Sequence, residues 1–529
     1  MSLISKILPS WKTALLAILA AVLLIVAFPD FEWWFTAWFA LVPLMWAVER
    51  EKESVVRSFV VGWLFGTVFF FGTCWWLTFA PINYAGFPPW LAYSGMAFVA
   101  AVVGLFPALF AGILAVLLRR FGSWGFLAAP FVWVFTEFLR YWLAGNNWNA
   151  IGYSQAFVEV WPVFLFWTAR LGGVLLTGAV VVSVNCLIAR TFVVLIGADE
   201  MRPKLKQCFI EWAAFLTISL IALIVNFLTI GELRSEVPRF TVIAVQPNVP
   251  MSYLDPIRLE QLRERQINLA EAEIAKLTAE QRSNILVVFP ESPMNFMYTD
   301  DREFQKFIGD FTQRNNVSVL FNSAEPDSTN AKYFNSAVMV GSDGRKVDEY
   351  DKIYLLPFGE AIPSPLDGIM PGFVGNFSYG REYDLFPVGD AKAGVMICFE
   401  SHFGALSREY VRKGADVLIE MTNDGYLGPT PVLRQHLANA VFRAVETKRP
   451  VLRATNVGIT VRINQYGDMC DSLISCGPES YTEGASVWSV SKSDGSQTFY
   501  VKYGDWFAWL CSAVTLGILA LSLRRRSTT

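Results

Sequence analysis

The chain has 529 residues, of which 54% are hydrophobic and 17% are charged, and its mean hydropathy is +0.39. Soluble domains carry about 25% charged residues, so this composition excludes a wholly soluble protein, and it also excludes an intrinsically disordered one. The formal net charge of −3 gives no basis for a nucleic-acid partner, and two histidines exclude a histidine-rich metal site.

The apolar residues gather in stretches long enough to cross a membrane, which takes about 17–25 residues. Residues 58–118 contain no Asp, Glu, Lys or Arg over 61 positions, which is enough for two spans separated by the turn signals at Pro81 and 86–89. Six further stretches bring the prediction to eight transmembrane helices, seven before residue 231 and one at the C-terminus. They are residues 13–28, 33–48, 124–143, 171–189, 212–230 and 506–523.

Basic residues predict the orientation, because short cytoplasmic loops are rich in Lys and Arg. With the N-terminus inside, the basic clusters fall on the cytoplasmic side, and the outer turns at 29–30 and 80–90 contain no basic residue. Both termini are then cytoplasmic. A cleaved signal peptide is the alternative interpretation of the N-terminus, and the second span that follows at once argues against it. The cytoplasmic clusters are Lys6 and Lys12; Arg50, Lys52 and Arg57; Arg119 and Arg120; Arg202, Lys204 and Lys206; and Arg524–Arg526, with Arg140 and Arg170 as exceptions.

Residues 232–505 carry most of the charge and form a predicted separate domain. Strand-length apolar runs alternate there with helical stretches, which favours an α/β domain. By the orientation argument this domain lies on the outer side, between a seven-helix region at 1–231 and a last helix with a basic tail at 506–529. The predicted strands are 240–245, 285–289, 317–321, 395–398, 417–419 and 451–453, and the predicted helices are 258–279 and 432–447.

Glu137 and Arg140 are the best ionisable candidates within the spans. Three residues apart on a helix, they share a face and can form a structural ion pair. The alternative is a polar lining for a lipid headgroup. A transporter would show such residues within its spans, but matched broken helices are not evident in the sequence.

Three segments of the outer domain carry reactive groups. Cys398 ends an apolar strand in GVMICFES, Glu291 follows another strand in FPES, and Lys352 and Glu360 flank the turn in DKIYLLPFGE. Together they supply a thiol, a base and a cation. A free thiol is mostly protonated at neutral pH, and a nearby ammonium and carboxylate can activate it. Lys352 and the backbone amide after Cys398 are candidate donors for the oxyanion of an acyl-transfer reaction.

These residues resemble the Glu-Lys-Cys triad of the nitrilase superfamily. With eight spans, the chain resembles its membrane branch, the bacterial apolipoprotein N-acyltransferases. The likeness covers essentially the whole chain. The segments that carry it, beyond the triad motifs, are TEFLR at 136–140, GYSQ at 152–155, TNDGYLG, QHLANAVFRAVE and LRATNVGIT.

The resemblance implies a four-layer α-β-β-α domain in the periplasm of a protein of the bacterial inner membrane. It implies that Cys398 takes an acyl chain from a phospholipid, phosphatidylethanolamine above all, as a thioester. The α-amino group of an S-diacylglyceryl cysteine at an apolipoprotein N-terminus then receives the chain. Glu291 is the implied base and Lys352 the implied oxyanion donor. Glu360, Glu400 and Asn335 match supporting residues of the family's site.

The sequence departs from the family pattern beside the site. Phe399 stands where a Tyr is frequent, and Tyr426 with Leu427 stands where a Trp-Phe pair is frequent. The apolar loop 362–386, with Met370, Phe373 and Phe377, either forms a lid that dips into the outer leaflet or packs on the core. These departures concern the lid and the acyl pocket.

Two other functions remain open on the sequence: a membrane-tethered nitrilase-type amidase, and a transporter with an outer regulatory domain. No metal or cofactor is expected, since His402 and His436 lack partners at metal-ligand spacing, and no G-x-S-x-G is present. We expect a monomer. Cys470 and Cys476 either form a disulfide or stay free. The sequence does not predict the acyl-chain or headgroup preference.

Overall fold

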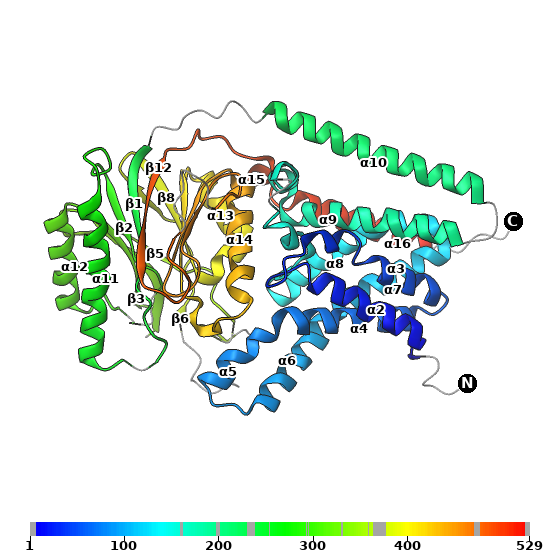
Figure 1. Cartoon of the computed structure of the whole chain (residues 1–529), viewed down its shortest axis with the longest axis horizontal. Helices are drawn as coiled ribbons and strands as arrows, with labels where there is room; N and C mark the ends of the chain where they lie inside the picture. The colour runs from blue at the N-terminus through cyan, green and yellow to red at the C-terminus, as the bar shows by residue number, and fades with distance from the viewer. Residues whose placement is uncertain are drawn as a thin grey trace. The chain divides into compact units, whose positions relative to one another are not determined.

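The structure is a computed structural model of the whole chain (Figure 1). The chain forms two compact units. The first comprises Met1–Glu232, Thr430–Ala438 and Tyr503–Thr529, and the second comprises Leu233–Pro429 and Asn439–Lys502. The structure describes residues 7–158, 162–196, 201–229, 238–252, 254–291, 294, 296–329, 332–357, 359–362, 377–469 and 477–523.

The first unit is helical. Its helices have apolar sequences, and Gly62 and Gly66 of α4 let that helix approach α7 closely: a Cβ on Gly62 would lie 2.4 Å from the Pro107 carbonyl oxygen. Its elements are α2 (Trp11–Ile25), η1 (Trp34–Trp38), α3 (Val42–Glu51), α4 (Val55–Cys74), η2 (Trp75–Thr78), α5 (Phe79–Asn83), α6 (Pro89–Val103), α7 (Leu105–Phe121), η3 (Gly122–Ala128), α8 (Ala129–Ala144), η4 (Ile151–Gln155), α9 (Pro162–Ile196), α10 (Met201–Thr229) and α16 (Trp506–Leu523).

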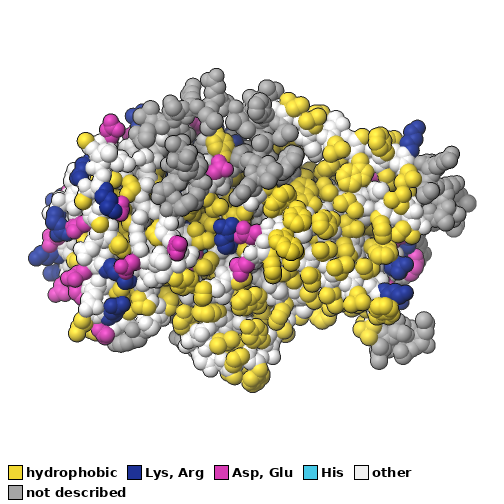
Figure 2. All heavy atoms as spheres, viewed as in Figure 1, with side chains coloured by type: hydrophobic (Ala, Val, Ile, Leu, Met, Phe, Trp, Pro, Cys, Tyr) yellow, Lys and Arg dark blue, Asp and Glu magenta, His cyan; other side chains and the backbone are white. Residues whose placement is uncertain are grey.

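The surface of this unit is strongly apolar. On the face drawn in Figure 2, hydrophobic side chains cover most of the helical unit, and large side chains such as Trp90, Phe98 and Ile218 are 64–70% exposed. Helices that are apolar on every side belong in a membrane. Among the described residues, four helical stretches are long and apolar enough to cross one: Val55–Asn83, Pro89–Ala144, Trp167–Ile196 and Leu205–Ala222; Trp11–Ile25 and Trp506–Ser522 are shorter apolar helices.

The predicted spans map unevenly onto these helices. The C-terminal span at 506–523 coincides with α16, and the charge-free stretch 58–118 is covered by α4 followed by α6 and α7, which meet at Gly104. The stretch 33–48 is not one helix, because η1 and α3 divide it. Since α3 has 10 residues, it is only about 15 Å long, half the hydrocarbon core. The prediction of one continuous helix there is wrong.

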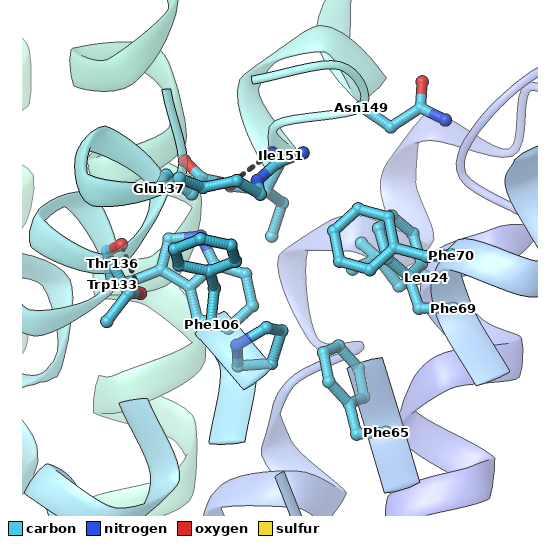
Figure 3. A pocket seen from close by; sticks show the side chains of 12 residues that line it. Leu24, Phe65, Phe69, Phe70, Phe106, Trp133, Thr136, Glu137, Asn149 and Ile151 are labelled. Atoms are coloured by element: carbon cyan, nitrogen blue, oxygen red, sulfur yellow. Dashed lines mark hydrogen bonds between the residues drawn. The ribbon is translucent and has the colours of Figure 1, made fainter. Parts of the chain in front are cut away.

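Glu137 and Arg140 lie on α8 and line a narrow pocket between α2, α4, α7 and α8 (Figure 3). Glu137 Oε1 accepts a hydrogen bond from the Ile151 amide at 2.9 Å, and Arg140 donates to the Trp148 carbonyl at 2.7 Å. Within the described part of the chain no salt bridge of 4.0 Å or less joins them, so the predicted direct ion pair is not formed, although their opposite charges interact. The headgroup lining stays a prediction.

The second unit is built on two β-sheets. In the described residues, one sheet has the order β12-β1-β2-β3-β4-β5, with β6 beside β4, and the other has the order β11-β10-β9-β8-β7. The strands are β1 (Pro238–Gln246), β2 (Ile285–Val288), β3 (Ser318–Asp327), β4 (Lys332–Val340), β5 (Lys346–Asp351), β6 (Phe377–Ser378), β7 (Leu385–Val388), β8 (Ala391–Ile397), β9 (Val417–Thr422), β10 (Val451–Thr455), β11 (Val461–Ile463) and β12 (Gly484–Ser491).

The two sheets pack face to face, with β1 against β10 and β4 against β8. Helices α11 (Pro256–Lys276) and α12 (Arg302–Asn315) cover the first sheet, and α13 (Gly404–Arg412) and α14 (Val432–Thr447) lie along the second (Figure 1). Between α11, α12 and their sheet lies a core that includes Ile267, Phe289 and Phe311. The predicted α/β domain with four α-β-β-α layers is confirmed. Remaining elements of the unit are η5 (Cys398–His402), η6 (Asp424–Leu427) and α15 (Phe499–Tyr503).

Candidate active site

The three reactive residues of the sequence analysis follow three different strands. Glu291 comes three residues after the end of β2, Lys352 directly follows β5, and Cys398 directly follows β8. The central strand β2 is fully buried, as expected for an apolar run between parallel neighbours. Rigid strands from both sheets therefore hold the three side chains of one site.

Lys352 is the buried cation of this site, with 1% of its side chain exposed. Its Nζ lies 2.9 Å from Glu360 Oε1 and 3.7 Å from Glu291 Oε1. Burial alone would lower the pKa of Lys352, but the charges of Glu360 and Glu291 outweigh it and raise that pKa. The lysine is therefore a fixed positive charge, and it cannot act as a base.

Asn335 completes the cluster around the two carboxylates. Its Nδ2 donates to Glu360 Oε1 at 2.6 Å and to Glu291 Oε1 at 3.2 Å, and its Oδ1 accepts from Asn322 Nδ2 at 2.7 Å. Burial raises the pKa of Glu291, and the Glu360 charge adds to this rise, while Lys352 and Asn335 oppose it. The pKa of Glu291 is thus shifted in the direction of neutral pH, as a general base requires.

Cys398 has a left-handed backbone conformation, with φ of 52°, at the junction of β8 and η5. Such a conformation is costly for a residue other than glycine, and it is common where a side chain must be presented at a functional site. The Cys398 side chain hydrogen-bonds with Glu291 and with Thr422. Burial and the Glu291 charge raise the pKa of the thiol well above its ordinary value. The protonated thiol is therefore the favoured form of Cys398, and Glu291 is one of its hydrogen-bond partners.

Glu400 joins the Lys352 segment to the Cys398 turn. It is fully buried, and its Oε1 accepts from the Tyr350 hydroxyl at 2.7 Å, the Ile353 amide at 2.8 Å and the Tyr354 amide at 3.0 Å. Its Oε2 accepts from the Ile397 amide at 2.9 Å. One carboxylate therefore fixes the backbone just after Lys352 and just before Cys398. These hydrogen bonds favour a positioning role for Glu400, which stays a prediction.

Comparisons with known proteins agree with this architecture over the whole chain. Residues 20–187 match the apolipoprotein N-acyltransferase N-terminal domain family, and residues 246–490 match the carbon-nitrogen hydrolase family. The apolipoprotein N-acyltransferase of Geobacter metallireducens is 30% identical, with alignment of 97% of this chain and 96% of that protein. The enzyme of the same name from Thermotoga maritima is 28% identical over 96% of this chain and 93% of its own.

The chain belongs to the apolipoprotein N-acyltransferase family. Among solved structures, a nitrilase-superfamily protein from Saccharomyces cerevisiae aligns with a TM-score of 0.37 and 17% identity, covering 48% of this chain and 91% of its own. The family resemblance stated from the sequence is confirmed. The catalytic roles of Glu291, Lys352 and Cys398 stay predictions, as does the set of site residues around them.

The structure places the other predicted site residues in different surroundings. Glu360, Asn335 and Glu400 lie in the hydrogen-bond network just described. Phe399 is buried, with its ring stacked on His402 at 5.7 Å between centroids. Tyr426 is 49% exposed on η6, and Phe377 lies in β6, where its amide donates to the Glu360 carbonyl. Met370 and Phe373 of the predicted lid lie outside the described residues, as do Cys470 and Cys476.

Sequence reasoning missed three residues of the network, namely Asn322, Tyr350 and Thr422. Asn322 interrupts the apolar run of β3, Tyr350 lies two residues before Lys352, and Thr422 ends β9. A polar residue inside an apolar strand is a usable signal, because buried polar groups need partners. Their partners come from other strands, and a single sequence does not specify which strands are neighbours.

Glu400 gives a prediction on stability. Burial raises the pKa of Glu400 to about 7, above the 4.5 of an ordinary glutamate. The folded state therefore holds the proton more tightly, and the stability from this group is lost as pH rises through about 7. Glu400→Gln removes the titration and places an amide N–H2 against the Ile397 amide. We expect the variant to unfold at a lower temperature than the wild type. The difference between the two unfolding temperatures should become smaller from pH 5 to pH 8, because only the wild type loses stability over this range. A gap that is constant with pH would contradict the prediction.

Proposed function

We propose that the protein transfers an acyl chain from a phospholipid, through a thioester on Cys398, to the α-amino group of an S-diacylglyceryl cysteine at the N-terminus of an apolipoprotein. The observation that carries this is the Lys352 ammonium, buried between Glu360 and Glu291, with Glu291 hydrogen-bonded to Cys398, in a chain of the apolipoprotein N-acyltransferase family. Full-length similarity to acyltransferases favours the transferase over the amidase and the transporter.

The first half-reaction uses the hydrogen bond between Cys398 and Glu291. Glu291 takes the thiol proton as the sulfur attacks the ester carbonyl of the phospholipid, and a C–S bond forms. The carbonyl oxygen of the ester becomes an oxyanion, which the Lys352 ammonium stabilises because it carries three N–H donors. The C–O bond then breaks, and the proton on Glu291 passes to the departing alcohol oxygen. A lysophospholipid leaves, and the acyl chain stays on Cys398 as a thioester.

The second half-reaction runs through the same groups. The neutral amine of the diacylglyceryl cysteine attacks the thioester carbonyl, and a C–N bond forms. Lys352 again stabilises the oxyanion, and Glu291 takes a proton from the attacking nitrogen. The C–S bond breaks, and the proton returns from Glu291 to the sulfur of Cys398. The product is an N-acylated lipoprotein, and the enzyme is restored without any cofactor.

Both substrates are anchored in a bilayer, which is why a helical unit accompanies the site. We place the helical unit in the bacterial inner membrane with the catalytic unit in the periplasm and both termini in the cytoplasm. An odd number of crossings before residue 231 and one crossing after 505 satisfy this arrangement, and the distribution of Lys and Arg supports it. Phosphatidylethanolamine is the donor that we expect, and the loop 362–386 is the candidate lid.

The function is tested by supplying both substrates to the purified full-length protein. With phosphatidylethanolamine and a diacylglyceryl lipopeptide, we expect a triacylated peptide and one lysophospholipid for each peptide acylated, as measured by mass spectrometry. An amidase or hydrolase would release free fatty acid instead, with no modified peptide. A peptide whose α-amino group is acetylated serves as the control and should not be acylated.

Substitutions of Glu291 and of Lys352 should impair the reaction in different ways. Glu291→Gln removes the proton acceptor and should block acylation of Cys398. Lys352→Ala removes one oxyanion donor and should slow single-turnover acylation by at least about 10²–10³. Lys352→Arg keeps the charge but has a wider planar head, so we expect no rescue. Rates of Lys352→Ala near those of the wild type would show that backbone amides alone stabilise the oxyanion.

A further inference from the structure

Asn335 can serve the site only in one of its two amide orientations. Its Nδ2 faces two carboxylates, 2.6 Å from Glu360 Oε1 and 3.2 Å from Glu291 Oε1. If the amide were turned by 180°, its carbonyl oxygen would face both carboxylates, and acceptor would meet acceptor. Side-chain amide orientation has to be fixed by the surrounding hydrogen bonds. The two carboxylates favour this orientation, and a donor on the other side of Asn335 would fix it by binding the Asn335 oxygen.

Asn322 is the residue on that side. It lies on β3, next to β4, which carries Asn335. Asn322 Nδ2 donates to Asn335 Oδ1 at 2.7 Å and to the Ser336 backbone carbonyl at 3.0 Å. A backbone carbonyl can only accept, so it determines which end of the Asn322 amide is the N–H2 group. That group in turn determines which end of Asn335 is the oxygen.

We propose that Asn322 is a positioning residue of the catalytic cluster. The Ser336 carbonyl fixes the orientation of the Asn322 amide, and Asn322 in turn holds the Asn335 amide with its N–H2 group directed at Glu291 and Glu360. The relevance of Asn322 to acyl transfer rests on the proposed function, whereas the hydrogen-bond geometry is that of the structure itself. The two hydrogen bonds described for the Asn322 amide go to Asn335 Oδ1 and to the Ser336 carbonyl, so Asn322 acts by keeping the Asn335 donor directed at the two acids.

The electrostatic consequence has a definite sign. The charged and titratable groups that face Glu291 are Lys352, Glu360 and Cys398, and Asp424 also acts on Cys398. A donor from Asn335 favours the anionic form of Glu291, whereas a carbonyl oxygen in its place disfavours it. Glu291 and Cys398 interact strongly, so these two groups titrate together. Loss of Asn322 should therefore shift the titration of the cluster to higher pH.

Alkylation of Cys398 by iodoacetamide tests this without any lipid substrate. The full-length protein is alkylated between pH 5 and pH 10, and the Cys398 peptide is quantified by mass spectrometry. Asn322→Asp places an acceptor against Ser336 and Asn335, so we expect the midpoint of the alkylation profile to rise by about one pH unit, about tenfold in rate at a fixed pH on the acid side. Asn322→Ala should shift it in the same direction by less. Asn268→Asp, on the exposed face of α11, adds the same charge and should leave the midpoint unchanged.

A double-mutant comparison separates positioning from a general loss of structure. In an Asn335→Ala background, Asn322→Ala should produce no further shift, because the proposed route to the acids runs through the Asn335 amide, which is gone. Unchanged midpoints in Asn322→Asp and Asn322→Ala, or additive shifts in the double variant, would overturn the proposal. Since alkylation needs no phospholipid, a shift of its profile in a protein that transfers no acyl chain would retain the role of Asn322 and reject only the acyl-transfer function.

Discussion

The Lys352 ammonium is almost completely buried, and the other groups of the catalytic site are arranged around this buried charge. An isolated buried charge would be strongly destabilising, so it needs partners close by. Glu360 and Glu291 supply two negative charges for one positive charge. The surplus negative charge, together with burial, raises the proton affinities of Glu291 and Cys398. A site built this way favours the protonated forms of the Glu291 carboxyl and the Cys398 thiol.

Such a cluster requires side chains that are held in fixed positions, and the fold fixes them in two ways. Strands β2, β5 and β8 end at the site, and buried hydrogen bonds then fix the segments beyond the strand ends. Glu400 links the backbone beside Lys352 to the backbone beside Cys398. Asn322 and Asn335 hold the Glu291 and Glu360 carboxylates in place in the same way. The backbone strain at Cys398 is tolerated because these contacts determine the conformation around it.

The sequence predicted what depends on local patterns and on chemistry, and it missed what depends on pairing. The predicted strand 285–289 corresponds to β2, because it is a continuous apolar run. The predicted helix 432–447 coincides with α14, because its pattern is helical over the whole segment. Strand β5, KVDEYD, has no apolar run and was not predicted. The stretch 33–48 is apolar enough for a span but forms η1 and α3, since composition does not reveal where a helix breaks. Glu291, Lys352 and Cys398 were found from motifs, whereas Asn322 needed the β3–β4 register.

The central claim is that Cys398 carries the acyl chain, and intact-mass measurement tests it most directly. Wild-type protein incubated with phospholipid alone should gain the mass of one acyl group and release one lysophospholipid, and hydroxylamine should remove the adduct. Cys398→Ala should gain nothing under the same conditions. Acyl transfer to a diacylglyceryl lipopeptide by Cys398→Ala, or transfer by the wild type without any hydroxylamine-sensitive adduct, would contradict the account.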